Sequence, residues 1–177
     1  IQIVKMTLFE KQLTFWLNGF KKLVVMGIGN KDCCDDGTGS IIAEKILDFV
    51  SKEKISHVKV FPCYDFPENF TGSVKKEKPD HILLIDSSIT GKKPGSIFIL
   101  NPEGINHEDI SSHRIPLRLL YEYLKKETRA DIAIIGIEPY YIGKGNKCSK
   151  PVEKTINRIV KFLEQLLKNA KIKNEKQ

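Results

Sequence analysis

Three short runs of the chain are almost purely apolar: LVVMGI at 23–28, HILLID at 81–86 and ADIAIIGI at 130–137. They lack the alternation of polar and apolar residues that a strand with one exposed face shows, so they predict strands covered on both faces. Such strands need helices on both sides of the sheet. The chain is therefore predicted to fold as an α/β protein.

Segments with helical spacing of apolar residues alternate with strand-like segments. Further strands are predicted at 57–61, stopped by Pro62, and at 96–100; helices are predicted at 41–50, in the segment after 63–72, at 116–124 and at 151–167. Only about nine residues separate the strand at 81–86 from the strand at 96–100, which is too few for a parallel crossover. The strand at 96–100 should therefore run antiparallel to its predecessor or pair as a hairpin at the sheet edge. The order predicts a three-layer sandwich around a mostly parallel five-stranded sheet with one antiparallel strand.

The chain is divided into three parts by composition. Residues 1–20 carry apolar residues at helical spacing, interrupted by charges such as Lys5 and Glu10, and predict an amphipathic helix that packs on the domain or on a partner rather than a signal peptide or membrane span. Residues 21–168 form the single α/β domain, and 169–177 a charged tail. With 177 residues, 41% of them hydrophobic, the chain can bury a core of its own.

Charge and cysteine content restrict the partners and the compartment. The formal net charge of +7 comes largely from lysines on helix faces and in the tail, without arginine clusters, so nucleic-acid binding is not expected and an acidic protein partner fits equally well. The four cysteines follow no CxxC spacing and are expected to be reduced thiols. We expect a cytoplasmic protein without membrane insertion, as a monomer or weak dimer.

An acidic loop follows the first predicted strand. Gly27, Gly29 and Asn30 end the strand, and the next residues include Asp35 and Asp36 where the following helix begins. The glycines lack the GxGxxG spacing, and carboxylates would repel a phosphate, so a nucleotide site is not favoured. Asp35 can cap the helix while Asp36 points into a cleft, and the reverse assignment is equally open.

Three candidate metal ligands fall beyond the carboxyl ends of the strands, where open α/β sheets bind ligands. They are Asp36, Asp86 and His113. Two carboxylates and an imidazole suit zinc, nickel or manganese and leave positions for water or substrate. Spacing alone is weak evidence, because a lone aspartate in such a loop is more often a helix cap. His107 is the alternative histidine.

Four motifs, in order, resemble those of the hydrogenase maturation endopeptidases, which trim the C-terminus of the large subunit of nickel-iron hydrogenases. They are MGIGNKDCCDDGTG at 26–39, DHILLIDSS at 80–88 with KKPGSIFIL at 92–100, SSHRIPL at 111–117, and IIGIEPYYIG at 134–143 with KPVEK at 150–154. The last three are most similar to the branch that serves hydrogen-evolving or energy-converting enzymes. The chain differs from many relatives at 63–65, where they carry two glycines, and in its extra N-terminal helix.

The resemblance implies an α/β protease with a five-stranded sheet and a metal-binding triplet at Asp36, Asp86 and His113. Nickel is then supplied by the precursor of the large subunit as a recognition element, and no organic cofactor is bound tightly. The metal, or Asp35 or Asp36 as general base, would activate the attacking water, and the turn at 27–30 (Gly27, Gly29, Asn30) would contact the substrate. Two alternatives stay open: a nickel-dependent chaperone that does not cleave, and a zinc hydrolase of small substrates.

Overall fold

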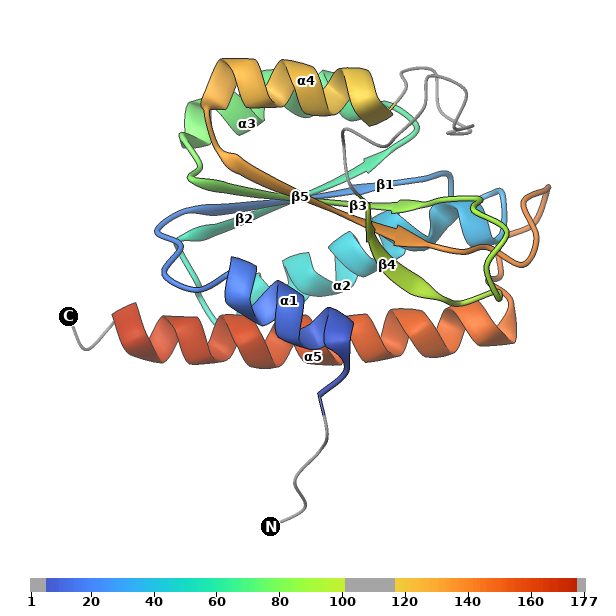
Figure 1. Cartoon of the computed structure of the whole chain (residues 1–177). Helices are drawn as coiled ribbons and strands as arrows, with labels where there is room; N and C mark the ends of the chain where they lie inside the picture. Colours follow the sequence, from blue (N-terminus) through green and yellow to red (C-terminus); the bar gives the residue numbers. More distant parts are fainter. Residues whose placement is uncertain (1–5, 101–116, 175–177) are drawn as a thin grey trace, which may run out of the picture.

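The computed structural model describes residues 6–100 and 117–174. Its five strands form one sheet in the order β2-β1-β3-β5-β4, mostly parallel, as predicted (Figure 1). The strands are β1 (Leu23–Ile28), β2 (Val58–Tyr64), β3 (His81–Ser87), β4 (Ile97–Leu100) and β5 (Asp131–Ile137). The helices are α1 (Leu8–Trp16), α2 (Thr38–Lys52), α3 (Thr71–Glu77), α4 (Leu117–Thr128) and α5 (Lys150–Asn174), with short 3-10 turns η1 (Asp35–Gly37) and η2 (Pro67–Phe70).

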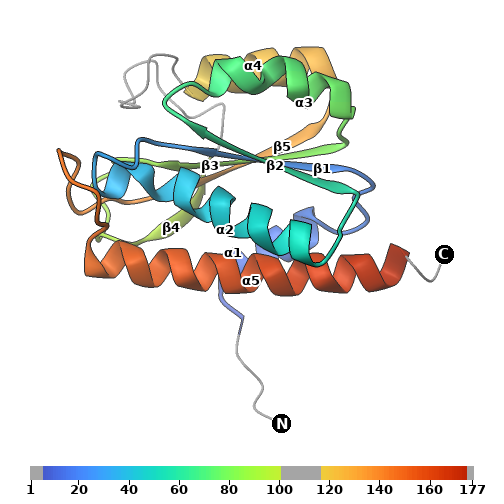
Figure 2. The same ribbon diagram turned by 180° about the vertical axis from the view of Figure 1, so that it is seen from behind.

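Helices cover both faces of the sheet. Helices α3 and α4 lie on one face, and α1, α2 and α5 lie on the other (Figures 1 and 2). Alternate residues of each central strand therefore enter two separate apolar clusters: in β3, Leu83 and Ile85 face α2 and α5, whereas Ile82 and Leu84 face the other side. This two-sided burial explains why β1, β3 and β5 read as continuous apolar runs, and it confirms the three-layer prediction.

Strand β4 runs antiparallel to β5 at the sheet edge. The predicted direction and edge position are confirmed, but the hairpin alternative is wrong. Strand β5 is inserted between β3 and β4, so the short link after β3 crosses the end of β5 instead of turning directly back. Gly136 permits this pairing, because a Cβ there would lie 2.4 Å from a ring carbon of Phe98.

The prediction that Pro62 stops the second strand is wrong. Strand β2 continues through Pro62 to Tyr64, and its register with β1 shifts between Gly27 and Ile28. Proline lacks an N–H and is tolerated on edge strands and at such irregularities. The extension matters for the site, because the Gly29 amide donates to the Tyr64 carbonyl at 2.9 Å.

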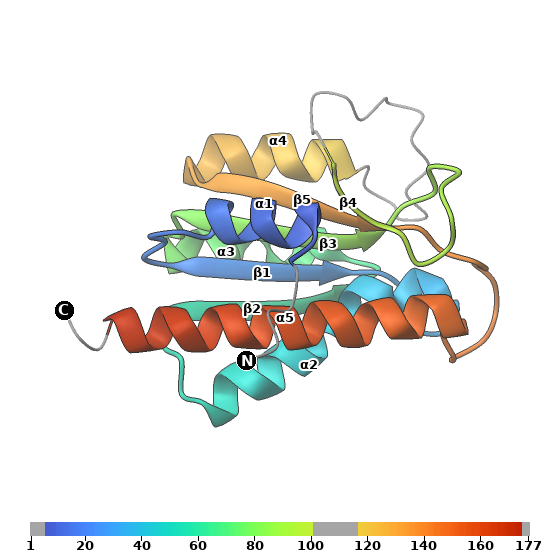
Figure 3. The same ribbon diagram turned by 60° about the horizontal axis from the view of Figure 1, so that its bottom comes forward.

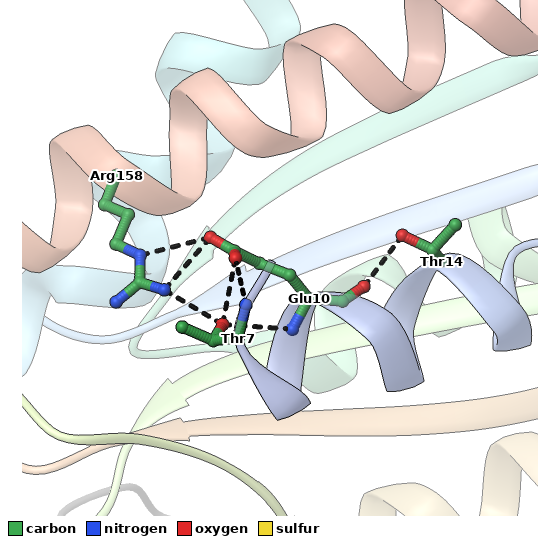
Figure 4. A network of polar contacts seen from close by, with 4 residues as sticks. All are labelled: Thr7, Glu10, Thr14 and Arg158. Atoms are coloured by element: carbon green, nitrogen blue, oxygen red, sulfur yellow. Dashed lines mark hydrogen bonds and ion pairs between the residues drawn. The ribbon is translucent and has the colours of Figure 1, made fainter. Parts of the chain in front are cut away.

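The terminal helices also differ in extent from the prediction. Helix α1 covers only Leu8–Trp16, and its Leu13 is fully buried against the domain. Its start is closed by a capping box between Thr7 and Glu10, and Arg158 of α5 donates to Glu10 at 3.0 Å and to Thr7 at 2.9 Å (Figure 4). Helix α5 runs through Asn174, so most of the expected charged tail is helical. None of the helices in the described part of the chain is long and apolar enough to cross a membrane.

Candidate active site

The acidic loop and the ends of β1, β3 and β5 meet at one edge of the sheet. Turn η1 follows β1 and contacts β3, and in the pairing of β1 with β3 Gly27 lies opposite Ile85, one residue before Asp86. In Figure 3 the loops after these strands gather at the edge where α2 and α5 begin. Asp36 and Asp86 thus belong to neighbouring strand ends, as the sequence predicts.

Both aspartates are almost completely buried. Asp36 is 2% exposed and Asp86 1%. The carboxylate of Asp36 accepts a hydrogen bond from the Asn30 amide at 2.9 Å and another from the Ser87 hydroxyl at 3.2 Å. Carboxylates removed from water are stable only when they are hydrogen-bonded, paired with a positive charge or bound to a metal. Two of them at one sheet edge make a centre suited to a cation.

Asp35 serves the neighbouring loop rather than the helix. Its Oδ2 accepts from the amides of Tyr140 and Tyr141 at 2.9 and 3.1 Å and from the Ser149 hydroxyl at 2.8 Å, and its Oδ1 accepts from the Ser149 amide at 2.6 Å. The suggestion that Asp35 caps the first helix of the domain is wrong: the N-cap of α2 is Gly37, and no side chain caps it. Both oxygens of Asp35 are engaged in holding residues 140–149, and its role as general base stays a prediction.

Glu138 holds the other loop of this edge and was not singled out from the sequence. It is 4% exposed, directly follows β5, and accepts hydrogen bonds from the Thr90 amide and hydroxyl and from the Gly91 amide, at 2.6–3.1 Å. A carboxylate directly after a buried strand is the same signal that singled out Asp86. The signal was available in the sequence, but no partner for Glu138 could be named there.

The predicted substrate-contacting residues all have structural contacts. A Cβ on Gly27 would lie 2.1 Å from the Gly39 carbonyl oxygen, and one on Gly29, at φ +129°, would lie 1.8 Å from the Asp36 carbonyl oxygen. Both glycines are buried, while Asn30 is half-buried and its Oδ1 accepts from the Asp32 amide at 2.8 Å. The two glycines allow α2 and η1 to approach β1 closely, because neither has a side chain. Contact with a substrate stays a prediction for all three.

Two cysteines near this edge, Cys33 and Cys148, have thiols whose pKa is raised. Cys148 lies with its Sγ 3.7 Å from the Cys34 carbonyl oxygen, and burial together with the charge of Asp35 raises the pKa of its thiol to about 11. Burial and the charge of Asp36 also raise the pKa of Cys33. A thiol that stays protonated near neutral pH does not attack a peptide bond. All four cysteines are free, as expected.

The predicted metal triplet is described in part. His113 lies outside the described residues, as does its alternative His107. Within the described ranges no group of three or more histidine, cysteine, aspartate or glutamate side chains is arranged to hold a metal ion. The triplet therefore stays a prediction, with its two carboxylates located at the same edge.

The fold and the site define a three-layer α/β domain with two buried carboxylates at neighbouring strand ends, and comparison with known proteins identifies the family. The profile of the hydrogenase maturation proteases matches residues 43–166. A candidate hydrogenase maturation protease of Methanocaldococcus jannaschii is 32% identical over 157 residues, which cover 85% of this chain and 93% of that protein. The hydrogenase 3 maturation protease of Escherichia coli is 28% identical over 142 residues, covering 80% and 88%.

Solved structures agree with the sequence comparisons. The crystal structure of a nickel-iron hydrogenase maturation protease from Thermococcus kodakarensis superimposes with a TM-score of 0.81 at 29% identity, covering 89% of this chain and 99% of that one. The crystal structure of the hydrogenase 3 maturation protease gives 0.68 at 25% identity, covering 79% and 87%. The chain belongs to the hydrogenase maturation protease family, as its motifs predicted, and is a peptidase. Its assignment to the hydrogen-evolving branch stays a prediction.

Proposed function

We propose that this protein is a cytoplasmic endopeptidase that removes a short C-terminal extension from the nickel-loaded precursor of a nickel-iron hydrogenase large subunit. Membership of the maturation protease family supports the reaction class. The single structural observation that carries the proposal is the pair of buried carboxylates, Asp36 and Asp86, at neighbouring strand ends. The protein itself then needs no resident metal, because the nickel is part of the substrate.

In the proposed mechanism the chain supplies ligands and rigidity. Asp36, Asp86 and His113 would bind the nickel of the precursor and so hold the scissile peptide at the sheet edge. The Asn30 amide and the Ser87 hydroxyl fix the carboxylate of Asp36, which therefore needs little reordering when the cation arrives. Holding the reacting groups together makes attack effectively unimolecular and can remove several kcal/mol from the barrier. The bound cation would supply Lewis-acid activation, or Asp35 or Asp36 would accept the proton of the water that attacks the peptide carbonyl; the C–N bond then breaks, and that proton passes to the amine of the released peptide.

Intact-mass analysis of a large-subunit precursor, incubated with this protein with and without nickel in the precursor, tests the proposal. Loss of a C-terminal peptide only from the nickel-loaded sample is the expected result. A stable complex without any loss of mass would favour the chaperone alternative. Stoichiometric zinc in the purified protein, together with hydrolysis of small substrates in the absence of a precursor, would favour the zinc hydrolase.

Substitution of the predicted ligands gives a sharper test. We expect Asp36→Asn and His113→Ala to abolish processing, because each removes one ligand of the cation, while thermal unfolding stays cooperative. Asp32→Asn is the matched control: Asp32 lies in the same loop but is exposed. Processing at the normal rate by either ligand variant would contradict the assigned role.

A further inference from the structure

The two loops around the carboxylate centre carry lysines and no acidic residue. Residues 88–96 (SITGKKPGS) and 139–149 (PYYIGKGNKCS) contain no aspartate or glutamate. Their lysines, Lys92, Lys93, Lys144 and Lys147, are all exposed. We call these four lysines the basic rim. The chain has 22 acidic residues among 177, and neither of these two loops contains one, so the exposed charge of the two loops is positive.

The two loops are held together as one surface. The Gly95 amide donates to the Glu138 carbonyl at 2.8 Å, and the Glu138 amide donates to the Ser96 carbonyl at 3.0 Å. The Ser88 amide donates to the Ile137 carbonyl at 2.9 Å. In Figure 1 both loops leave the sheet beyond the ends of β3 and β5. The roots of the two loops are therefore joined, and both loops leave the sheet from the same place.

Buried carboxylates fix the backbone under the rim. Glu138 binds the Gly91 amide, directly before Lys92, and Asp35 binds the Ser149 amide, two residues after Lys147. The Gly145 amide donates to the Asp32 carbonyl at 2.8 Å, directly after Lys144. Rigid backbone lowers the entropy that the loops lose when a partner binds. The rim is thus a prepared surface rather than lysines on unrestrained loops.

Within the described part of the chain these lysines are available for a partner. No acidic side chain lies within ion-pair distance of Lys93, Lys144 or Lys147 there, and Lys92 lies 5.2 Å from the ring centre of Phe98. Large apolar groups of the same loops are exposed as well: Ile89 by 58%, Tyr140 by 71% and Tyr141 by 55%. Exposed aromatic rings are enriched in protein-binding surfaces, and the lysines of these loops add positive charge that complements an acidic partner.

We propose that the basic rim binds an acidic segment of the precursor protein, with the exposed rings packing against apolar residues of that segment. This inference rests on the proposed function for the identity of the partner. Buried carboxylates lie at the strand ends, and the four exposed lysines lie on two of the loops that follow these ends. The complementary partner presents a cation at its centre and carboxylates around it, which is what a metal-loaded protein with an acidic flank offers. The rim also attracts such a partner over a distance at low ionic strength.

A binding experiment with a defined acidic peptide tests the rim without depending on cleavage. The probe is a fluorescently labelled hexaglutamate peptide, and its anisotropy is measured with the full-length protein. The rim variant carries Lys93→Gln, Lys144→Gln and Lys147→Gln; the matched control carries Lys76→Gln, Lys126→Gln and Lys161→Gln, exposed helix lysines outside the two loops. We expect the rim variant to bind about tenfold more weakly than the wild type at about 20 mM salt, since each exposed charge pair contributes modestly. The control should stay within about twofold, and added salt should remove the difference.

The processing assay with the nickel-loaded precursor then separates the two proposals. KM should rise for the rim variant by a similar factor while kcat stays unchanged. Equal effects of the rim and control variants on both peptide and precursor would overturn the rim but leave the endopeptidase function intact. Salt-sensitive binding of the precursor through the rim without cleavage would support the rim and overturn the endopeptidase function. Loss of duplex DNA binding in the rim variant, with precursor binding unchanged, would assign the surface to nucleic acid and overturn the proposal.

Discussion

Replacing Asp35 by asparagine separates a positioning role from a catalytic one. The carboxylate of Asp35 is fully buried and accepts hydrogen bonds on both oxygens from residues 140–149. Asparagine has nearly the same shape but a single acceptor oxygen. If that oxygen takes the place of Oδ2, the amide NH₂ group faces the Ser149 N–H, a donor against a donor. At least one charge-assisted bond is lost, and the remaining bonds are weakened.

The expected cost follows from these contacts. A hydrogen bond to a charged group contributes about 1.5–3 kcal/mol, and an unsatisfied buried donor costs about 1–3 kcal/mol. Allowing for partial relaxation, we expect Asp35→Asn to lower the free energy of unfolding by about 3 kcal/mol. For a chain of this size that corresponds to a fall in Tm of roughly 6–12 °C. Asp32→Asn is again the control, and its Tm should stay within about 1–2 °C of the wild type because surface changes have small effects.

Thermal unfolding followed by circular dichroism measures this cost, and hydrogen exchange locates it. Faster exchange of the Tyr140, Tyr141 and Ser149 amides, with the strand amides unchanged, would show that the loop has been released locally. An unchanged Tm with lost proteolysis would refute the reasoning, because it would mean that Asp35 acts in the chemistry and adds little to the fold. An unchanged Tm with normal proteolysis would show that the four hydrogen bonds to Asp35 contribute little to the free energy of unfolding.

Three further predictions concern the rest of the molecule. Arg158→Ala should cost at most about 1 kcal/mol at pH 7, since its pair with Glu10 is partly exposed. Burial raises the pKa of Glu10, but its hydrogen bonds to Thr7 and its ion pair with Arg158 outweigh burial and hold the pKa below 4.5. Urea unfolding should therefore show the stabilisation by the Glu10–Arg158 pair in full above pH 4.5, and its loss as the pH falls through the lowered pKa. Gly39→Ala should prevent soluble expression, because its Cβ would lie 2.1 Å from the Ile85 carbonyl oxygen, whereas Gly72→Ala in α3 meets nothing within 4 Å and should leave Tm equal or higher. Iodoacetamide at pH 8 should modify Cys148 slowly in the folded protein and rapidly in urea, because its folded pKa of about 11 keeps it protonated.

The arrangement of strands could be predicted well because local sequence controls it. In β3, Leu83 and Ile85 face one helical layer, and Ile82 and Leu84 face the other. The continuous apolar run HILLID therefore predicts burial on both faces. The errors have a different origin. The continuation of β2 through Pro62 and the insertion of β5 beside β4 depend on which strand lies next to which, and that is a property of the assembled sheet.

The site shows the same division. The location of Asp36 and Asp86 at neighbouring strand ends follows from the parallel sheet, and the structure agrees with it. The division of labour between Asp35 and Asp36 does not follow from the sequence, because adjacent residues of a short turn point in different directions. The partners that decide their roles, Ser149 for Asp35 and Asn30 for Asp36, lie 114 and 6 residues away. The contact between Asp35 and Ser149, 114 residues apart, could not be predicted from neighbouring residues in the sequence.

The buried carboxylates of this edge fall into two pairs with opposite tasks. Asp35 and Glu138 point into the backbone of the two loops, where amide and hydroxyl donors satisfy them. Asp36 and Asp86 lie at the ends of β1 and β3, and a cation brought by a partner would stabilise them further. The first pair fixes the loops that present the basic rim, and under the proposed function the second pair would attract the cation that the rim itself would repel. A partner with only acidic charge would bind at the rim alone, and the lysines of the rim would repel a free cation. The rim and the pair Asp36 and Asp86 together would therefore favour a ligand that carries both a cation and acidic groups. If both proposals hold, this arrangement of charge would select a metal-loaded precursor over either component alone.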